Sequence, residues 1–477
     1  MKKLFRVEDC ETLTNDDVRA LYRKHVNPAL ENIFSSFSIG SELIDHAEGV
    51  WIYTKSGKQI LDATGGVGVL NHGHNHPRIL KVRKAYLEEK RMEVHKTIFS
   101  PYLAVLSHNL AAVLPEGMDY SFFCNSGAEA IEGAMKLAYK YHGGGRKFIL
   151  HSNISYHGKL LGSGSIMGSK EVDFNFPKIP NTASFEYNSV ESVKQLINKL
   201  RNTDGSSQIY ALFVEPYSAS TFRNCDEFFL KEIRRICNEE KIILVFDEIF
   251  SGWCKTNNLF YFMNYDIIPD ILTTSKSLGG GKASISAYVV RKEILKTAYG
   301  NVNDAVLHST TYNGFGEECV TAIEAINIMV EENYVDKSRK AEKIIERRIN
   351  SLVDNFPELV AGYRGVGTMF CILLKTKTTL LDSVVKVMPL RIVQQPNFIS
   401  KLITASFTDW LFVHHQIYAM FTDDGIVFSP PVIIEEKEID VFFNAFEETM
   451  KAGFLKIVMH FVANKLSNIL RPDILAK

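Results

Sequence analysis

Between about residues 120 and 320, short apolar segments alternate with longer amphipathic ones, and this alternation restricts the fold more than any other sequence feature. Six of the apolar segments are predicted strands: YSFFCNSG, KFILHSN, IYALFVEP, KIILVFDEI, DILTTSKS and SAYVVRKE. Runs such as IILVF are apolar on both faces, as strands must be in a parallel sheet that helices cover on each side. The sequence therefore predicts an α/β fold with a mostly parallel, doubly wound sheet.

The segments between these strands carry helix signals. Asn188 and Glu191 have the spacing of a capping box, and the apolar residues that follow share one helical face: Val190, Val193, Ile197 and Leu200. A chain of 477 residues is too long for one hydrophobic core. We predict a large domain at residues 71–325 and a smaller α+β domain built from residues 1–70 and 326–477.

The net charge points to small-molecule partners. The formal charge is −1 and no long basic run is present, which argues against nucleic acid. No window approaches the ~20 unbroken apolar residues of a membrane span. The start MKKLFRVEDCETLTNDD turns acidic before an apolar signal core forms, and seven scattered cysteines without a C-x-x-C pair suggest reduced thiols. We expect a cytoplasmic protein.

Polar residues gather where the predicted strands end, which is where ligands bind in open parallel sheets. These strand-end residues are Ser126, Gly127, Glu215, Asp247, Glu248 and Lys276. A strand-end acid alone is often only a helix cap. Here the carboxyl edge of the predicted sheet would carry a lysine, acidic groups and a helix that begins with glycine. Together these groups predict a ligand-binding site.

Lys276 lies among small hydroxyl residues in TTSKSLGGGKAS. A Walker phosphate loop does not fit, because Ala283 follows Gly281-Lys282 and Lys276 occupies the place of the first glycine. An amine at a strand end can form an imine with a carbonyl, and pyridoxal phosphate is the commonest carbonyl cofactor with that need. Neighbouring glycines would let the backbone approach it. The alternative is a solvated loop lysine.

Three neighbours favour the cofactor. Asp247 ends a wholly apolar strand and could face the pyridine nitrogen, which must stay protonated for the ring to act as an electron sink. The turn NSGAEA would offer backbone N–H groups to a phosphate at a helix N-terminus. Tyr156 in SYHG would stack on the ring or be an ordinary core aromatic.

With these residues placed, the sequence resembles the class III pyridoxal-phosphate aminotransferases of fold type I, a group that includes ornithine, putrescine, 4-aminobutyrate and other ω-amine enzymes. The resemblance runs from HVNPAL at 25–30 to SPPVIIEEKEID at 429–440. Its motifs are LDATGGVGVLNHGHNHP, YSFFCNSGAEA, YHG, VEP, FDEI, SKSLGGG, HSTTYNG and RGVG, and YSFFCNSG looks like the putrescine branch. It implies ping-pong transfer of an amino group from a primary amine or amino acid to an aldehyde or keto acceptor.

The resemblance also implies residue roles. Lys276 would form the Schiff base and move the proton between the amine carbon and the cofactor's C4′. Asp247 would pair with the pyridine nitrogen, while Tyr156 and Ile249 would cover the two ring faces. Thr311 would reach across a homodimer interface to the phosphate of the partner subunit. Within one subunit the phosphate would be bound by Ser126, Gly127 and Ala128.

Three histidines have two interpretations. His72, His74 and His76 invite a metal assignment, yet their segment ends in Pro77 like a turn, with no acidic or cysteine ligand close in sequence. They fall in the family's Gly-His-x-His-Pro turn, which implies no metal.

The sequence departs from the family at polar positions. Phe250 replaces a Gln that approaches the cofactor's phenolic oxygen. Val427 replaces an Arg that binds a substrate α-carboxylate, and Ser220 replaces the Glu that pairs with it. Met420 occupies the nearest position to the Arg of the amine:pyruvate branch. Because an unpaired buried Glu would be costly, joint loss of Arg and Glu is consistent and suggests different substrates.

Residues 376–421 look longer than the usual connection, and FISKLITASFTDWLFVHHQIYAMF is rich in aromatic and aliphatic side chains. Our hypothesis is that this segment lines an apolar access path for an aldehyde or amine with a hydrocarbon portion. The alternative is that it belongs to the core of the smaller domain.

Two other functions remain open on this fold. A pyridoxal-phosphate-dependent aminomutase or decarboxylase would turn over without a free amino acceptor. A non-catalytic binding protein would explain the missing Gln, Arg and Glu, but the presence of Lys276 and Asp247 argues against it.

Overall fold

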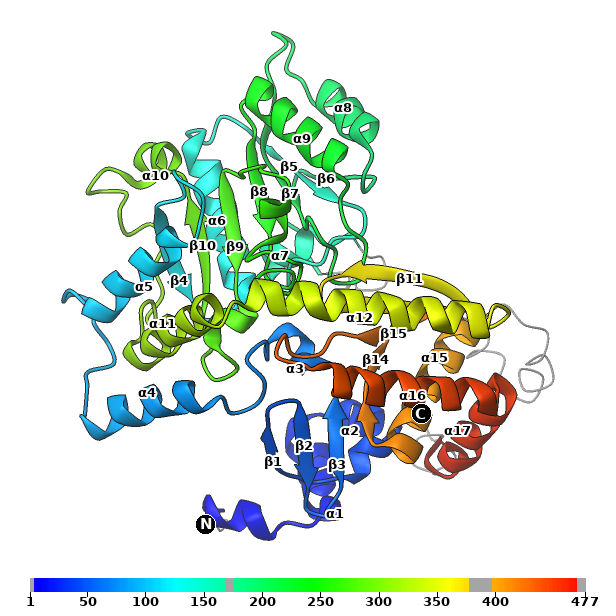
Figure 1. Cartoon of the computed structure of the whole chain (residues 1–477). Helices are drawn as coiled ribbons and strands as arrows, with labels where there is room; N and C mark the ends of the chain where they lie inside the picture. The colour runs from blue at the N-terminus through cyan, green and yellow to red at the C-terminus, as the bar shows by residue number, and fades with distance from the viewer. Residues whose placement is uncertain (1–3, 169–175, 377–396, 470–477) are drawn as a thin grey trace.

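The computed structural model describes residues 4–168, 176–376 and 397–469. A seven-stranded sheet forms its centre, in the order β4-β10-β9-β8-β7-β5-β6 (Figure 1). The strands are β4 (Tyr120–Cys124), β5 (Phe148–Ser152), β6 (Thr182–Phe185), β7 (Ile209–Val214), β8 (Ile243–Asp247), β9 (Ile271–Thr274) and β10 (Ser286–Val290). β5 to β9 pair in parallel, whereas β10 is antiparallel to both of its neighbours. The six predicted strands are confirmed.

Helices cover both faces of this sheet, which confirms the doubly wound arrangement. In β8, Ile243 and Val245 pack on one face with α6 and α10, whereas Leu244 and Phe246 pack on the other with α5, α8, α9 and α11. Alternate residues of a strand point to opposite faces, so a strand covered on both sides must be apolar throughout. The helices of this part are α4 (Pro77–Glu88), α5 (Pro101–Ala112), α6 (Gly127–Tyr141), α7 (Leu161–Ser165), α8 (Val190–Lys199), α9 (Glu227–Glu240), α10 (Lys292–Tyr299) and α11 (Gly316–Glu331).

The start of α8 differs from the predicted capping box. Its N-cap is Ser189, one residue later than expected, and no box forms between Asn188 and Glu191. Asn188 has a left-handed φ of 63°, its Nδ2 donates to the Asn224 carbonyl at 3.1 Å, and its Oδ1 accepts from the Asp226 amide at 3.2 Å. The side chain thus binds a neighbouring loop instead of the helix.

Segments from the two ends of the chain pack together beside the large sheet (Figure 1). One sheet contains β1 (Ile44–Glu48), β2 (Trp51–Thr54), β3 (Gln59–Asp62) and β13 (Ile417–Tyr418), and β13 is parallel to β3. An antiparallel sheet contains β11 (Val360–Val366), β12 (Met369–Leu374), β15 (Gly425–Phe428) and β14 (Met420–Phe421). The short N-terminal elements are η1 (Glu8–Thr12), α1 (Asn15–Leu21), η2 (Tyr22–Val26), α2 (Pro28–Ser35) and η3 (Ser38–Ser41).

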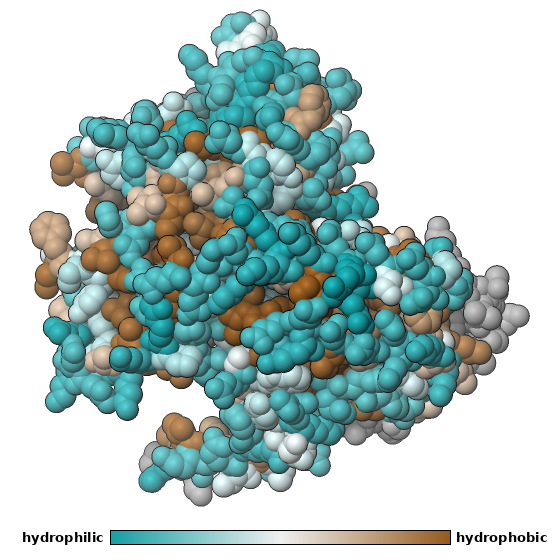
Figure 2. Space-filling view, in the orientation of Figure 1, coloured by the Kyte–Doolittle hydropathy of each residue, from teal (hydrophilic) through white to brown (hydrophobic). Residues whose placement is uncertain are grey.

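Four helices complete this second group of elements: α12 (Tyr334–Asn355), α15 (Phe398–His415), α16 (Glu436–Ala452) and α17 (Phe454–Ile469). One apolar core joins Val50 and Leu61 to Phe407 of α15 and to Phe428. α12 buries Ile345 and its apolar neighbours in this core, and Figure 2 shows hydrophilic side chains along its outer surface. No helix in the described ranges combines the length and apolar character needed to cross a membrane.

Part of the segment 376–421, for which the sequence allows two interpretations, belongs to this core. Ile403, Phe407 and Leu411 of α15 are buried in it, as the alternative interpretation predicts. Phe412 and the residues from Ile417 to Phe421 line a cavity. Residues 377–396 of the same segment lie outside the described residues.

Candidate active site

Lys276 lies at the carboxyl end of β9. It begins the short helix η6 (Lys276–Gly279) with a φ of 50°, a left-handed conformation that few residues with a Cβ adopt. Its Nζ donates a hydrogen bond to the Val67 carbonyl oxygen at 2.9 Å and lies 4.2 Å from the centroid of the Phe250 ring. The amine thus points from the sheet edge toward α3 (Gly65–Gly68), beside an aromatic face.

Packing within the chain accounts for two of the glycines after Lys276. Gly280 and Gly281 have φ values of 57° and 76°. A Cβ on Gly280 would lie 2.5 Å from Ile79 Cδ1, and a Cβ on Gly281 would lie 2.6 Å from Leu70 Cδ2. Larger residues would strain this turn and push the neighbours away, so these glycines keep η6 close to the rest of the chain.

Asp247 ends β8 and is buried with both carboxylate oxygens engaged. Its Oδ2 lies 2.7 Å from His157 Nδ1, and its Oδ1 accepts from the Ile249 amide at 3.0 Å. His157 is also buried, and its Nε2 has no partner in the described part of the chain. The His157 imidazole therefore fixes the orientation of the Asp247 carboxylate. Sequence reasoning missed His157, although it follows Tyr156 directly in the YHG motif.

Glu215 follows β7 and fixes the loop that carries Tyr156. Its Oε2 accepts from the Tyr156 amide at 2.8 Å, and its Oε1 accepts from the Ala219 amide at 3.0 Å. Burial raises the pKa of Glu215 to about 7, opposed by His157 and reinforced by Asp247. The Tyr156 side chain is 40% exposed, so it is not a core aromatic.

The N-terminus of α6 presents backbone amides beside Ile249. Ser126 caps the helix in a capping box with Glu129, whose Oε2 accepts from the Asn125 and Ser126 amides at 2.9 and 2.8 Å. The next two residues, Gly127 and Ala128, have first-turn amides for which a helix supplies no acceptor. A Cβ on Gly127 would lie 2.7 Å from Ile249 Cδ1, so glycine permits this close contact.

Thr311 is exposed on the loop before α11, and its side chain forms no hydrogen bond in the part of the chain that the structure describes. Its role at the phosphate stays a prediction. The other predicted residues come from the ends of β4, β8 and β9 and from the loop after β5.

Two lysines with altered pKa values lie near each other. Burial lowers the pKa of Lys276 to about 8, while Asp247 and Glu215 act in the opposite direction. Lys255 is fully buried, with its Nζ 3.3 Å from the Pro430 carbonyl, and burial together with Lys276 lowers its pKa to about 7. The sequence does not indicate this electrostatic interaction between Lys255 and Lys276, because it depends on the tertiary fold.

The histidines of the HGHNHP turn take separate partners. His72 Nε2 lies 3.0 Å from the Ala325 carbonyl, His74 Nε2 lies 3.0 Å from Asp62 Oδ2, and His76 precedes α4. Among the described residues, no group of three or more His, Cys, Asp or Glu side chains is arranged to hold a metal ion.

This arrangement suits pyridoxal phosphate. Lys276 offers an amine with a lowered pKa, Asp247 offers an oriented carboxylate, and Gly127 opens a helix whose first amides and dipole favour an anion. These are the three groups that the cofactor's aldehyde, ring nitrogen and phosphate need. Fold and site together define a pyridoxal-phosphate-dependent transferase of fold type I.

The chain belongs to the class III aminotransferase family. The sequence model of the family, aminotransferase class-III, matches residues 39–450. Class III aminotransferases use pyridoxal phosphate, act on small molecules and are typically dimers. This protein is thus a pyridoxal-phosphate-dependent aminotransferase, as the sequence motifs predict.

Solved structures share the fold. A thermostable (S)-enantioselective omega-transaminase from Thermomicrobium roseum is 22% identical, with a TM-score of 0.79 over 92% of this chain and 99% of its own. The ornithine aminotransferase of Toxoplasma gondii is 20% identical, with a TM-score of 0.76 over 98% of this chain and 100% of its own. A PMP-bound aminotransferase from Vibrio fluvialis is 22% identical, with a TM-score of 0.74 over 87% and 93%.

The lowered pKa of Lys276 predicts how cofactor uptake depends on pH. Only the neutral amine attacks a carbonyl, and burial moves half-neutralisation from the usual 10.5 down to about pH 8. The rate of cofactor uptake by the apoprotein should therefore rise through about pH 8 and level off above it. Stopped-flow absorbance across pH 6 to 11 measures this; a midpoint near that of a free lysine would contradict the burial of the amine.

Proposed function

We propose that this aminotransferase acts on an amine or aldehyde with an apolar portion, passing an amino group from a primary amine or amino acid donor to an aldehyde or keto acceptor in two half-reactions. The observation that carries the proposal is the Phe250 ring, 4.2 Å from Lys276 Nζ. Val427 is buried and Met420 lines an apolar cavity, so neither position offers a cation to a substrate carboxylate.

In the proposed reaction, each of four side chains of this chain has its own role. Lys276 would hold the bound cofactor covalently until the donor amine displaces it; the released neutral amine would then accept the proton from the amine-bearing carbon and return it at the cofactor's C4′. Asp247, oriented by His157, would keep the ring nitrogen protonated. Tyr156 and Ile249 would cover the two faces of the ring. The bound cofactor supplies an electron sink for the pair left behind when that carbon loses its proton.

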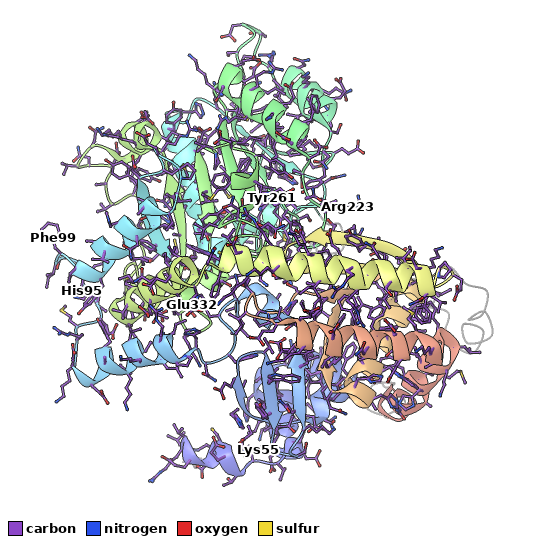
Figure 3. All side chains as sticks on the ribbon, in the orientation of Figure 1. Lys55, His95, Phe99, Arg223, Tyr261 and Glu332 are labelled. Atoms are coloured by element: carbon purple, nitrogen blue, oxygen red, sulfur yellow. The ribbon has the colours of Figure 1, made fainter. Side chains whose placement is uncertain are left out.

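The phosphate contacts come from two subunits in this proposal. The amides of Gly127 and Ala128 bind it, with the Ser126 hydroxyl beside them, and Thr311 reaches the phosphate of the partner subunit. Exposed apolar side chains support such a dimer. On the loop before α5, Phe99 is fully exposed and points away from the rest of the chain (Figure 3). Other exposed apolar residues of that loop are Met92, Val94 and Ile98.

A substitution at Thr311 tests this contact. Thr311→Val keeps the shape but removes a hydrogen bond to a charged group, which contributes about 1.5–3 kcal/mol, so cofactor affinity should fall about 10- to 100-fold. Equilibrium dialysis measures the affinity, and sedimentation velocity should still show a dimer. Ser309→Ala on the same exposed loop is the matched control. Unchanged affinity in Thr311→Val, or full affinity in a monomer, would refute the shared site.

We further propose that residues 71–325 form the large domain and that residues 1–70 and 326–477 form the smaller one. The sheet shared by β3 and β13 supports this division.

We also propose a cytoplasmic location. It is supported by seven free cysteines, six of which are buried.

Turnover with simple donors tests the proposed substrate class. The full-length holoenzyme should convert hexylamine faster than putrescine, since a second ammonium group would have to leave water beside apolar walls. Amino product should appear only when a carbonyl acceptor is added. A clear preference for putrescine would rule out the apolar substrate, and turnover without acceptor would favour an aminomutase or decarboxylase.

A further inference from the structure

An apolar cavity lies outside the candidate active site. It has a volume of about 670 Å³ and lies between the N-terminal elements α1, α2 and η3 on one side and α15, β13 and β14 on the other. Figure 1 places α1 and α2 beside β1–β3, away from the seven-stranded sheet. Apolar lining residues from both sides include Val18, Ile33, Phe34, Phe37, Phe412 and Met420.

Two of the three carboxylates in the cavity wall are buried, and both already have partners. Glu31 accepts from Arg19 Nε at 2.8 Å and from Arg23 Nη2 at 3.1 Å. Asp409 accepts from the Ser38 amide at 2.6 Å and from the Ser38 hydroxyl at 3.0 Å. These buried acids are satisfied by the chain itself, so the cavity favours an uncharged, apolar occupant.

The inner wall of the cavity connects to the Lys276 site through the backbone. Tyr418 lines the cavity and pairs in the β13–β3 ladder with Asp62. β3 leads through two residues into α3, whose Val67 carbonyl accepts the Lys276 hydrogen bond. The five residues from Asp62 to Val67 would span at most about 17 Å if they were extended.

We propose that this cavity holds the hydrocarbon chain of the substrate, with the amine or aldehyde end at Lys276. This inference rests on the proposed function and narrows its substrate to a long linear chain. At about 1.5 Å for each carbon–carbon bond, a linear tail of about eleven bonds covers even this upper limit, so a dodecyl chain is long enough to reach from Lys276 to the cavity. Short amines react at Lys276 without reaching the cavity.

Burial of the tail gives a chain-length dependence that can be measured. Each methylene that enters an apolar cavity strengthens binding about fourfold. In the full-length holoenzyme, kcat/KM for linear primary amines from butylamine to dodecylamine should therefore stay level for short chains and rise steeply for long ones.

Two surface variants test whether the chain-length dependence of kcat/KM arises in the cavity. Ile33 is 57% exposed and lines the cavity, so Ile33→Glu places a charge at the mouth without disturbing a buried core. This variant should lower the ratio of dodecylamine to butylamine kcat/KM at least about tenfold. Leu87 on α4 is 58% exposed and does not line the cavity, so Leu87→Glu is the matched control and should leave the ratio unchanged.

Calorimetric titration with dodecanol supplies a readout that is independent of turnover. The alcohol has no reactive amine, and it should bind the full-length protein saturably with a negative heat-capacity change. Ile33→Glu should weaken this binding and Leu87→Glu should not.

The outcomes separate this inference from the proposed function. If no amine of any length is converted, the proposed function fails. If butylamine and dodecylamine are converted equally well and Ile33→Glu changes neither the ratio nor dodecanol binding, the cavity assignment fails while the aminotransferase remains. If dodecanol binds in the cavity without any chain-length preference in turnover, the occupant is not the substrate tail and the inference is overturned.

Discussion

Lys276→Ala should abolish covalent cofactor binding and lower kcat about 10⁴-fold or more. The substitution removes the nucleophile, and it also removes a general base, a role that by itself contributes about 10²–10⁴-fold. The visible absorbance of the bound cofactor should disappear from the purified protein. Thermal unfolding should show a protein at least as stable as the unsubstituted apoprotein, because a half-buried amine that is costly to charge has been removed.

Lys282→Ala is the matched control for this experiment. Lys282 lies in the same glycine-rich segment but is exposed, and it is the lysine that a Walker loop would have used. We expect this variant to keep both the absorbance and the activity. If Lys282→Ala lost the cofactor and Lys276→Ala kept it, the assignment of the catalytic lysine would be wrong.

Asp247→Asn should retain the fold and bind the cofactor, but its kcat should fall between about 10²- and 5 × 10³-fold. Asparagine can still meet His157, which lies 2.7 Å from the Asp247 carboxylate, yet it carries no charge to keep the pyridine nitrogen protonated. Loss of one partner from a buried ion pair costs about 3–5 kcal/mol, which corresponds to this range.

Single-turnover kinetics at saturating cofactor measure the effect on chemistry alone. Asp247→Glu restores the charge on a longer side chain and should recover part of the rate, which a purely structural role for Asp247 would not explain. Wild-type single-turnover rates in Asp247→Asn would exclude its proposed pairing with the ring.

Local sequence patterns predicted the strands and the polar residues at their carboxyl ends, because each of these features depends on neighbouring residues. The segment that became β8 is apolar at every position and ends in Asp247, which specifies both a covered strand and its polar end. The edge strand β6 was missed because its sequence, TASF, is short and half polar. The reversed direction of β10 depends on pairing with β4 and β9, which no local pattern encodes.

Contacts between distant residues were beyond local patterns for the same reason. His157 and Asp247 are 90 positions apart, and only the ordering of β5, β7 and β8 brings their ends together. The cavity joins residues 15–52 to residues 408–421, so neither segment alone indicates it. Composition marked residues 398–421 as apolar, which include one wall of the cavity, but nothing in that segment indicates the opposite wall.

The pairing of β3 with β13 affects the order in which the protein can fold. β3 ends at Asp62, and its partner Tyr418 is synthesised only after most of the chain has left the ribosome. The seven-stranded sheet, whose strands lie between β3 and β13 in the sequence, can form first. Until β13 is available, the edge of β3 stays unpaired. Closing so long a loop is slow, so we expect refolding to proceed through an intermediate with an ordered central sheet and an N-terminus sensitive to proteases.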